Sequence, residues 1–549
     1  MADNKYSNIF KSLDDQYTSW KILHKDIQKY ILPRRGNFVD YGKPDDPANI
    51  NRSDDIINSA ATRANRILGS GLQGGLTNPA RRWFELALQD SDLAKWGPVK
   101  DWLVGAAKVM YRVYGSSNFY SQIHRIFEEQ GGFGTACIIQ EEDFDRVIHF
   151  TTFPTGEYRL QNNEKGIADT VYRHYWMTAQ NIVKQFGWKA STSVQNAAKK
   201  DKSPFEYFEI IHGIEPRPGY DPTKIDAKNM PYRSVKFEYK ADDGSLLAES
   251  GYNEMPHAAP RWTPVGNASY GLGPGCEALG DSKMIQQMET ESLKAIHKAV
   301  NPPLNVPGQF KDVISQLPGA HNYSEGDGKA RITPLFEMGL DVGSVEAKIQ
   351  SVEARISQTF FNDIFTLISN VEKSMGRSIT ATEILERKQE KMILLGPTIE
   401  RQMFELLDPI VERTFNICLR NGLFPPLPQE IEGQVLKVEY VSPLAQAQQL
   451  ADAQSMEAYS IQTQTVAGME PSTVLKTNWD QYLEQYAEIV GVPPNIVRNQ
   501  DEVDALRQEM QEAQAAEAQA QQAQAEAEAI RNLGQSNMDG TALGALTEA

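Results

Sequence analysis

The residues best suited to chemistry are carboxylates gathered in one short segment. Glu141, Glu142, Asp143 and Asp145 lie almost consecutively, and carboxylate oxygens are ligands that divalent cations accept. The cluster would suit a metal-dependent enzyme of nucleic-acid processing. It is equally typical of a solvated turn between two strands, because charged side chains stay in water unless they are paired. We favour the turn and expect no catalytic residue and no metal site.

A glycine cluster before a helix is the second chemical candidate. Gly271, Gly273 and Gly275 superficially suggest dinucleotide binding. Their spacing differs from G-x-G-x-x-G, Pro274 removes an amide donor, and no clear strand precedes them. The sequence also has no G-x-x-x-x-G-K-[ST] phosphate loop and no Ser in a G-x-S-x-G context. We therefore predict a hinge at Gly271, Gly273, Pro274 and Gly275, and no cofactor.

The histidines, cysteines and tryptophans are spaced like structural residues. The eight histidines are scattered, and we expect His297 to be a packing or surface residue. Cys137, Cys276 and Cys418 are far apart and lack CxxC partners, which favours reduced, buried thiols in a cytosolic compartment. We expect one group of aromatic residues to be core rather than a base-stacking platform. These are Trp83, Phe84, Trp96 and Trp102.

Composition narrows the classes of function further. The chain has 549 residues, enough for several domains, and a formal net charge of −17. It contains no apolar run of the roughly 18 residues that a membrane span needs, so we expect no membrane association. The negative charge argues against a basic groove that wraps nucleic acid. It remains compatible with a wall past which DNA slides, because an acidic surface repels phosphates.

The first half of the chain is typical of an α+β domain over residues 1–265. Helical periodicity covers residues 6–32, a second helix begins near residue 53, and the glycines of residues 69–75 are predicted to end it. Residues 82–88 alternate like a strand, and residues 90–130 return to a helical pattern. Residues 134–260 hold short β-branched and aromatic segments with one helix at 178–187, which predicts an antiparallel sheet.

The middle of the chain predicts two helices that flank a compact insert, like a stalk with a tip. The helices cover residues 276–301 and 345–370, and the insert between them is rich in proline and glycine. The second helix carries two stripes at helical spacing. The apolar stripe is Val345, Ile349, Val352, Ile356 and Phe360. The polar stripe is Glu346, Gln350, Glu353 and Ser357.

A longer helix is predicted over residues 380–422. Thr380 and Glu383 form a capping box at its start, and Gly396-Pro397 should kink it because proline removes a helical hydrogen bond. A strand at 435–440 and helices near 443–467, 472–490 and 501–533 follow. The last helix is acidic and rich in Ala, Gln and Glu, with too little apolar area to fold alone. We expect it to be disordered or helical only beside copies of itself.

The central segments resemble the head-to-tail connector, or portal, proteins of short-tailed bacteriophages. The matching segments span about 175 residues in the family's order. They are Tyr270-Gly271-Leu272-Gly273-Pro274-Gly275, Leu279-Gly280-Asp281, Lys298, Asn301-Pro302-Pro303-Leu304, Thr380-Ala381-Thr382-Glu383, Leu394-Leu395-Gly396-Pro397, Glu405-Leu406-Leu407-Asp408-Pro409 and Tyr440-Val441-Ser442-Pro443-Leu444-Ala445. Arg82-Trp83-Phe84 also fits, less specifically.

The resemblance implies a predominantly helical α+β subunit with a named set of regions. They are a wing (1–272), a first stem helix (273–301), a clip (302–344), a second stem helix (345–369), a tunnel loop (370–379), a long kinked wing helix (380–424), a return strand with crown helices (425–499), and a C-terminal barrel helix or disordered tail (500–549).

The resemblance also implies a function in the virion. Family members form a ring of about twelve subunits at one capsid vertex, around a channel for double-stranded DNA. The expected partners are copies of the chain, the packaging terminase ATPase, tail adaptor and other tail proteins, and major capsid and scaffold proteins. The ATPase would supply the work, and the ring itself would be non-enzymatic. DNA contacts should be few and independent of sequence.

Candidate site residues follow from this mapping. We expect the channel to be lined by Glu346, Gln350, Glu353, Ser357, Lys373 and Arg377. We expect the clip to dock partners through Lys311, Asp312, Glu325, Asp327, Lys329 and Arg331. Two other classes stay open: a structural capsid or scaffold protein without a DNA channel, and a nucleic-acid enzyme that uses the carboxylates at 141–145.

Overall fold

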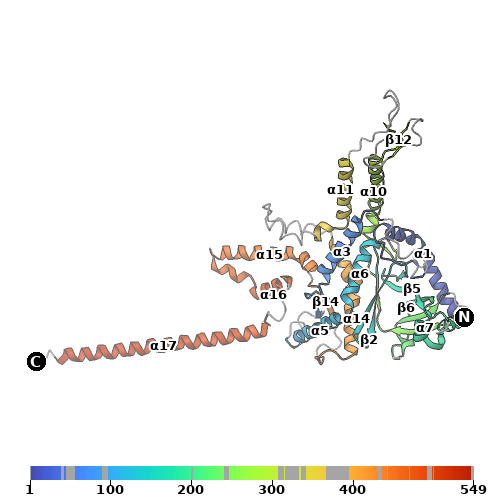
Figure 1. The fold of residues 1–549 in the computed structure, drawn as a ribbon. Helices are drawn as coiled ribbons and strands as arrows, with labels where there is room; N and C mark the ends of the chain where they lie inside the picture. Colours follow the sequence, from blue (N-terminus) through green and yellow to red (C-terminus); the bar gives the residue numbers. More distant parts are fainter. Residues whose placement is uncertain are drawn as a thin grey trace, which may run out of the picture. The chain divides into compact units, whose positions relative to one another are not determined.

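The structure is a computed structural model. It describes residues 2–545 apart from 39–42, 45–55, 89–96, 200–201, 225, 240–245, 307–313, 316–332, 336–341, 366–394, 429–435, 442, 469, 491–496 and 499. The fold is α+β and predominantly helical, as the sequence predicts (Figure 1). The chain divides into two compact units. Unit 1 holds residues 1–85, 107–424 and 438–451, and unit 2 holds residues 86–106, 425–437 and 452–549.

A five-stranded antiparallel sheet lies in unit 1. Its strand order is β4-β5-β6-β7-β8. The strands are β4 (Tyr158–Asn162), β5 (Ala168–Thr178), β6 (Tyr207–Pro216), β7 (Tyr232–Glu238) and β8 (Leu246–Tyr252). The predicted antiparallel sheet in residues 134–260 is therefore confirmed. Sequence reasoning missed β4 and β8, because charged and small residues such as Arg159, Glu249 and Gly251 interrupt their apolar alternation.

Helices cover both faces of this sheet. From α1 (Ala2–Tyr30), an apolar stripe that includes Phe10 packs on β-strand residues of one face, among them Tyr172 and Ile211. Successive side chains of a strand point to opposite faces. Ile210 accordingly belongs to a different cluster, with residues of α7 (Ala179–Phe186) and α8 (Thr192–Ala197).

A second sheet and an aromatic cluster complete the core of unit 1. The sheet has the order β3 (Val147–Phe153), β2 (Cys137–Asp143) and β9 (His257–Ala258). The cluster lies beside α6 (Phe119–Phe133). Trp83 and Phe84 are fully buried, and the Trp83 ring stacks on Phe119 with 5.8 Å between centroids. Their predicted place in the core is confirmed.

The described part of the chain also contains three two-stranded sheets and the helix α5 (Gly97–Ser116). β1 (Glu85–Leu88) pairs with β14 (Leu436–Glu439), and α5 follows β1 in the chain. Trp102 on α5 is buried and donates from its Nε1 to the Pro425 carbonyl at 3.1 Å, while Trp96 lies outside the described residues. Two further two-stranded sheets pair β10 (Thr263–Pro264) with β11 (Gly271–Leu272) and β12 (Leu304–Asn305) with β13 (Thr333–Pro334).

The glycines at 69–75 do not end a helix. The helix α3 (Ala60–Leu76) runs through them, so that prediction was wrong. A Cβ on Gly69 would come within 2.8 Å of Glu128 on α6, and a Cβ on Gly71 would lie 2.2 Å from the Phe365 ring. The glycines therefore serve close packing, and this tertiary contact outweighs the cost of about 1 kcal/mol for glycine inside a helix.

The two central helices are present in unit 1. They are α10 (Leu279–Val300), preceded by the short α9 (Pro274–Glu277), and α11 (Val342–Thr359). The predicted second helix was too long, because α11 ends at Thr359 rather than near 370. Phe361 has a φ of 55°, which breaks the helix. Phe360 and Phe365 are buried on either side of this turn.

The long helix predicted for 380–422 is described only from Leu395. Residues 395–402 are α-helical, residues Met403–Leu407 form a π-helical turn, and α14 (Asp408–Arg420) follows. The Asp408 amide donates to the Met403 carbonyl, five residues back. Pro409 supplies no N–H to continue the α pattern, which explains a π-turn at this place. Thr380 and Glu383 lie outside the described residues.

Unit 2 is mainly helical. It holds most of α15 (Pro443–Ala467), the 3-10 turn η7 (Pro471–Lys476), α16 (Trp479–Val490) and α17 (Gln500–Ala545). Tyr482 on α16 donates to the Met456 carbonyl on α15 at 2.9 Å, and Arg507 on α17 binds Asp480 on α16 at 2.7 Å. The described side chains of α17 are almost all exposed. None of the described helices is both long enough and apolar enough to span a membrane.

Candidate functional site in the central helix pair

The helices α10 and α11 lie side by side and project from the rest of unit 1 (Figure 1). They run antiparallel, because Asp281 at the start of α10 meets Arg355 near the end of α11 at 2.9 Å. The apolar stripe predicted for the second helix is confirmed. Ile349, Val352, Ile356 and Phe360 are buried, and Val345 is half-buried.

The polar stripe of α11 has two different parts. Glu346 and Gln350 are exposed, and the Gln350 amide donates to Glu346 Oε1 at 3.5 Å. Glu353 and Ser357 are half-buried. Glu353 Oε1 accepts a hydrogen bond of 2.9 Å from Asn58 Nδ2. In a single chain, therefore, only Glu346 and Gln350, which lie farther from the body of unit 1, are fully exposed to solvent.

Asn58 joins both projecting helices to the body of unit 1. Its Nδ2 also donates to Glu289 Oε1 on α10 at 3.0 Å, so one amide binds a carboxylate from each helix. Its Oδ1 accepts from the Ala60 amide at 2.9 Å, at the start of α3. We call Asn58, Gln286, Glu289 and Glu353 the helix-base clasp.

Gln286 completes the clasp from α10. It is 5% exposed. Its Oε1 accepts from the Ile57 and Asn58 amides at 2.8 and 2.9 Å, and its Nε2 donates to the Asn58 carbonyl at 2.7 Å. Sequence reasoning missed the clasp, since 228 residues separate the partners. The available signal was a glutamine next to Ile285 on the same face of the first central helix as Leu293 and Ile296.

The predicted hinge glycines pack against the end of α6. A Cβ on Gly273 would lie 2.6 Å from the Gln130 carbonyl oxygen, and one on Gly275 would lie 2.3 Å from that of Gly132. Gly271 donates its amide to Thr135 Oγ1 at 2.7 Å, and Pro274 takes the first position of α9, where no amide is needed. The glycines thus permit backbone contact at the point where α10 begins. Movement at this point stays a prediction.

Ion pairs connect the π-turn and α14 with the segments on either side of β9. Glu405 in the π-turn accepts from the Arg261 backbone amide at 2.8 Å and pairs with its guanidinium at 2.7 Å. Arg413 on α14 is 3% exposed by its side chain and binds Glu254 at 2.9 Å. A lone buried charge costs several kcal/mol, so these pairings are required once the arginines are buried.

Only the end of the acidic segment 141–145 lies in the predicted turn. Glu141, Glu142 and Asp143 are the last residues of β2, and Asp145 lies in the turn that follows. Asp143 Oδ1 accepts from the Asp145 amide at 2.8 Å. Glu142 pairs with Arg420 at 2.8 Å, and Glu141 accepts from the Tyr252 hydroxyl at 3.4 Å. Across the part of the chain that the structure describes, no group of three or more His, Cys, Asp or Glu is placed to hold a metal ion.

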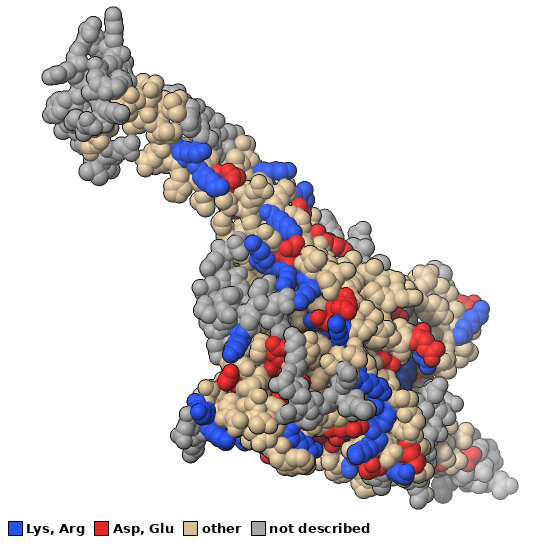
Figure 2. Space-filling model, turned by 90° about the vertical axis from the view of Figure 1, so that its right-hand side faces the viewer, with Lys and Arg blue, Asp and Glu red and all other residues tan. Residues whose placement is uncertain are grey.

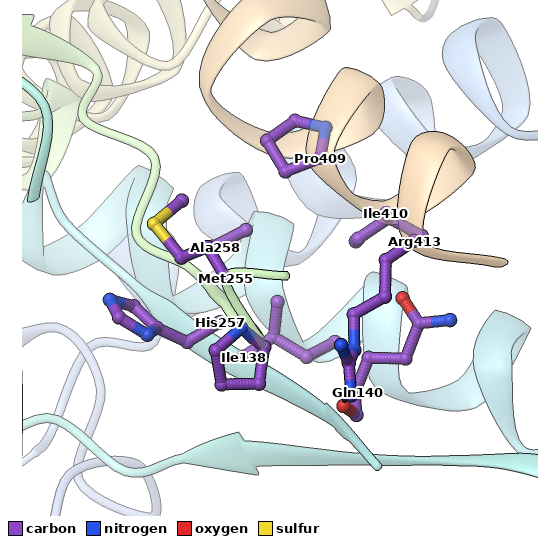
Figure 3. Close-up of a pocket in the computed structure, with 9 residues that line it drawn as sticks. Ile138, Gln140, Met255, His257, Ala258, Pro409, Ile410 and Arg413 are labelled. Atoms are coloured by element: carbon purple, nitrogen blue, oxygen red, sulfur yellow. Dashed lines mark hydrogen bonds between the residues drawn. The ribbon is translucent and has the colours of Figure 1, made fainter. Parts of the chain in front are cut away.

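The cavity beside β2 and β9 is too small for a substrate. Figure 3 shows Arg413, Ile410 and Pro409 of α14 on one side and Ile138, Gln140, His257 and Ala258 on the other. Its volume is about 10 Å³, close to the minimum for one water. A neighbouring depression of about 280 Å³ is lined by Glu141, Glu142, Tyr252 and Arg413. Glu142 and Arg413 are ion-paired within the chain, and Glu141 accepts a hydrogen bond from Tyr252.

The three cysteines are free thiols, as predicted. Cys137 and Cys418 are buried and Cys276 is partly buried. Burial raises the pKa of the Cys276 and Cys418 thiols to about 11 and raises that of Cys137 as well. At neutral pH they are protonated and poor nucleophiles.

Several predicted site residues lie outside the described residues. They are Lys311, Asp312, Glu325, Asp327, Lys329, Arg331, Lys373 and Arg377. Gly396 and Pro397 lie within helical residues 395–402, but the residues before 395 are not described, so the predicted kink stays a prediction.

Charges of both signs occur along the projecting helices. Figure 2 shows Lys and Arg side chains there, with Asp and Glu between them. The positive side chains include Lys294 and Arg355, each paired with a carboxylate of the same chain, Lys294 with Glu291 at 2.9 Å. A mixed surface of this kind is not the strongly basic stripe that binds nucleic acid tightly.

Comparison with known proteins establishes the family. The profile described as "Bacteriophage head to tail connecting protein" matches residues 3–497. The chain therefore belongs to the bacteriophage head-to-tail connecting protein family. It is 36% identical to the "Probable portal protein" of Bordetella phage BPP-1, over 96% of this chain and 94% of that protein.

A second relative aligns over the full length. The "Portal protein" of Salmonella phage epsilon15 is 34% identical, with 100% of this chain and 99% of that protein covered. A solved structure titled "Virion of native gene transfer agent (GTA) particle" aligns with 80% of this chain and 91% of its own at a TM-score of 0.34 and 9% identity. That score is too low to establish a shared fold.

Proposed function

We propose that this chain is the portal protein of a bacteriophage virion and acts at the capsid vertex where head and tail join. The observation that carries the proposal is the alignment over the whole chain with proteins named portal proteins from two phages. The match to the epsilon15 protein covers 100% of this chain, so it includes the projecting helices, the sheet domain and the C-terminal helices.

In this role about twelve copies form a closed ring around a channel for double-stranded DNA. Residues 1–272 and the helix at 380–424 form the wing, α10 and α11 form the stem, residues 302–344 form the clip and residues 370–379 form the tunnel loop. The α15 and α16 helices form the crown, and α17 forms a barrel with its copies. The antiparallel pair α10 and α11, with its apolar stripe buried and Glu346 and Gln350 exposed, supports the stem assignment.

The ring acts without catalysis of its own. A separate terminase ATPase docks on the clip during packaging and supplies the work, and tail adaptor proteins occupy the same surface afterwards. Capsid and scaffold proteins surround the wing. The mixed charges of the stem support a channel that DNA passes without adhering, and the contacts depend on salt rather than on base sequence.

Native mass spectrometry and axial electron-microscopy images of the purified full-length protein test the proposal. We expect a closed ring with α10 and α11 near the axis and a pore wide enough for duplex DNA. A protein that stays monomeric under assembly conditions would overturn the proposal. A ring with these helices on its outer rim would favour a structural capsid protein without a DNA channel.

A further inference from the structure

One face of α10 is covered near the body of unit 1 and exposed farther out. Residues 282, 285, 286, 289, 293, 296 and 300 follow the helical spacing of a single face. Ser282, Ile285 and Gln286 are buried. Leu293, Ile296 and Val300 are 45%, 39% and 75% exposed. We call these three residues the α10 ridge.

The change from covered to exposed has a definite cause. The loop at residues 57–58 binds Gln286 and Glu289 and covers this face at its base. Beyond Glu289 none of the described residues continues that cover over the ridge. Isolated apolar side chains are common on surfaces, but three on successive turns of one projecting helix form a contiguous patch, which is typical of an interface.

We propose that the α10 ridge packs against α11 of a neighbouring copy of this chain. The outward face of α11, opposite its buried stripe, carries Ala347, Ser351 and Ala354, and all three are exposed. Small side chains let a helix bearing bulky ones approach closely. The ridge of one copy and the small-residue face of the next therefore have complementary shapes.

The two surfaces also lie at similar heights along the stem. The Asp281–Arg355 pair marks one level of the antiparallel helices, and the bonds from Asn58 to Glu289 and Glu353 mark a second. Counting about 1.5 Å of rise per residue from each level brings Leu293 to within about one helical turn of Ala347. Different surfaces of the two copies meet, and a contact of this kind generates a ring when its rotation closes. The inference rests on the proposed function and adds the residues that form the contact.

Cysteine cross-linking of the assembled full-length protein tests the contact. The double variant Leu293→Cys with Ala347→Cys should give a ladder of covalent multimers on denaturing gels after mild oxidation. The matched control is Gln287→Cys with Ala347→Cys, because Gln287 is exposed on another face of α10. The unmodified chain controls for the three native thiols. An intrachain disulfide would give no ladder.

The outcomes separate this contact from the proposed function. A ring with no ladder from the Leu293 pair, or with an equal ladder from the Gln287 pair, overturns the contact and leaves the ring standing. A wild-type chain that never forms a ring overturns the proposed function and the contact with it.

A second variant tests the energetics. Leu293→Glu should raise the protein concentration for half-assembly by roughly tenfold or more, since it places a charge where a leucine would be buried. Gln287→Glu should leave assembly unchanged. If the Leu293→Glu monomer and the wild-type monomer unfold at the same midpoint temperature, the substitution leaves the fold intact. Assembly of Leu293→Glu at wild-type concentrations would overturn the contact.

Discussion

At the scale of residues, unit 1 contains several buried groups whose protonation is coupled to folding. His24 is fully buried, and its Nδ1 lies 2.8 Å from the Tyr17 hydroxyl. Burial, with a smaller contribution from Arg159, lowers the pKa of His24 to about 3. Burial also lowers the pKa of His257 to about 4 and lowers that of His212. Each imidazole is therefore neutral in the folded chain and charged in the unfolded chain below about pH 6.5.

Acid should destabilise the chain through these histidines. A lowered folded pKa means that stability is fully present above about pH 6.5 and declines as the pH falls toward the folded value, by about 1.4 kcal/mol per pH unit for each histidine. Burial raises the pKa of Glu129, which acts in the opposite sense. Between pH 7 and pH 5, the free energy of unfolding of His24→Gln should fall by about 2 kcal/mol less than that of the wild type. Denaturant unfolding at the two pH values measures this difference.

The control for this measurement is His297→Gln, which removes an exposed imidazole on α10. If His24→Gln and wild type lose equal free energy of unfolding over the same pH interval, His24 does not contribute to acid sensitivity.

Two glycines a few residues apart should respond oppositely to alanine. A Cβ on Gly275 would lie 2.3 Å from the Gly132 carbonyl oxygen, whereas a Cβ on Gly280 would meet no atom within 4 Å. Gly275→Ala should lower the free energy of unfolding by about 1–3 kcal/mol through overpacking. Gly280→Ala should raise it by up to about 1 kcal/mol through helix propensity. Chemical denaturation of both variants measures the contrast, and equal effects would mean that the close approach to α6 is not rigid.

At the scale of elements, the clasp determines how the projecting helices meet the body of unit 1. Asn58 precedes α3, and its side-chain amide is shared between a carboxylate on α10 and one on α11. The ion pair between Asp281 and Arg355 is partly exposed, and such pairs contribute only about 0–1 kcal/mol. The buried Gln286 and the amide of Asn58 are therefore the stronger links at the helix base.

Loss of the Asn58 side chain should loosen both helices together. Asn58→Ala leaves Glu289 and Glu353 close to each other without their shared donor, at a cost of about 1–3 kcal/mol. Hydrogen exchange should become faster in residues 282–289 and 350–356, while the β5–β6 pairs keep their protection. Asn118→Ala is the matched control, because Asn118 binds Phe150 away from the stem. Unchanged exchange in either projecting helix would contradict the clasp.

At the scale of the whole molecule, charge and exposed apolar surface point to an assembly. The chain has a net charge of −17. Several of its arginines, among them Arg261, Arg413 and Arg420, are paired with carboxylates of the same chain. The α10 ridge and most of α17 contact solvent in a single chain. α17 is long and polar, and its apolar residues are too few to cover a partner element of the same chain. The closed ring proposed above would cover both surfaces.

The sequence by itself determined the features that repeat along the chain. Helical spacing revealed the buried stripe of α11, alternation revealed most of the large sheet, and the motifs from Tyr270 to Ala445 indicated the connector family. These signals are local, because the periodicity of a helix or strand can be recognised within a short stretch of sequence. They also predicted a turn at residues 141–145, and a turn does follow β2, although Glu141, Glu142 and Asp143 belong to the strand itself.

Only the tertiary structure decided what distant residues do to each other. Sequence reasoning assigned a helix end to the glycines at 69–75, whereas α3 runs through them and Gly69 and Gly71 lie against the side chains of Glu128 and Phe365. The glycines at 271–275 lie where backbones touch, and their action as a hinge stays a prediction. Sequence reasoning could not pair Asn58 with Gln286, nor place Glu405 on Arg261. A glycine in a break and a glycine in a tight contact have the same local pattern, and only the element that folds against it distinguishes the two.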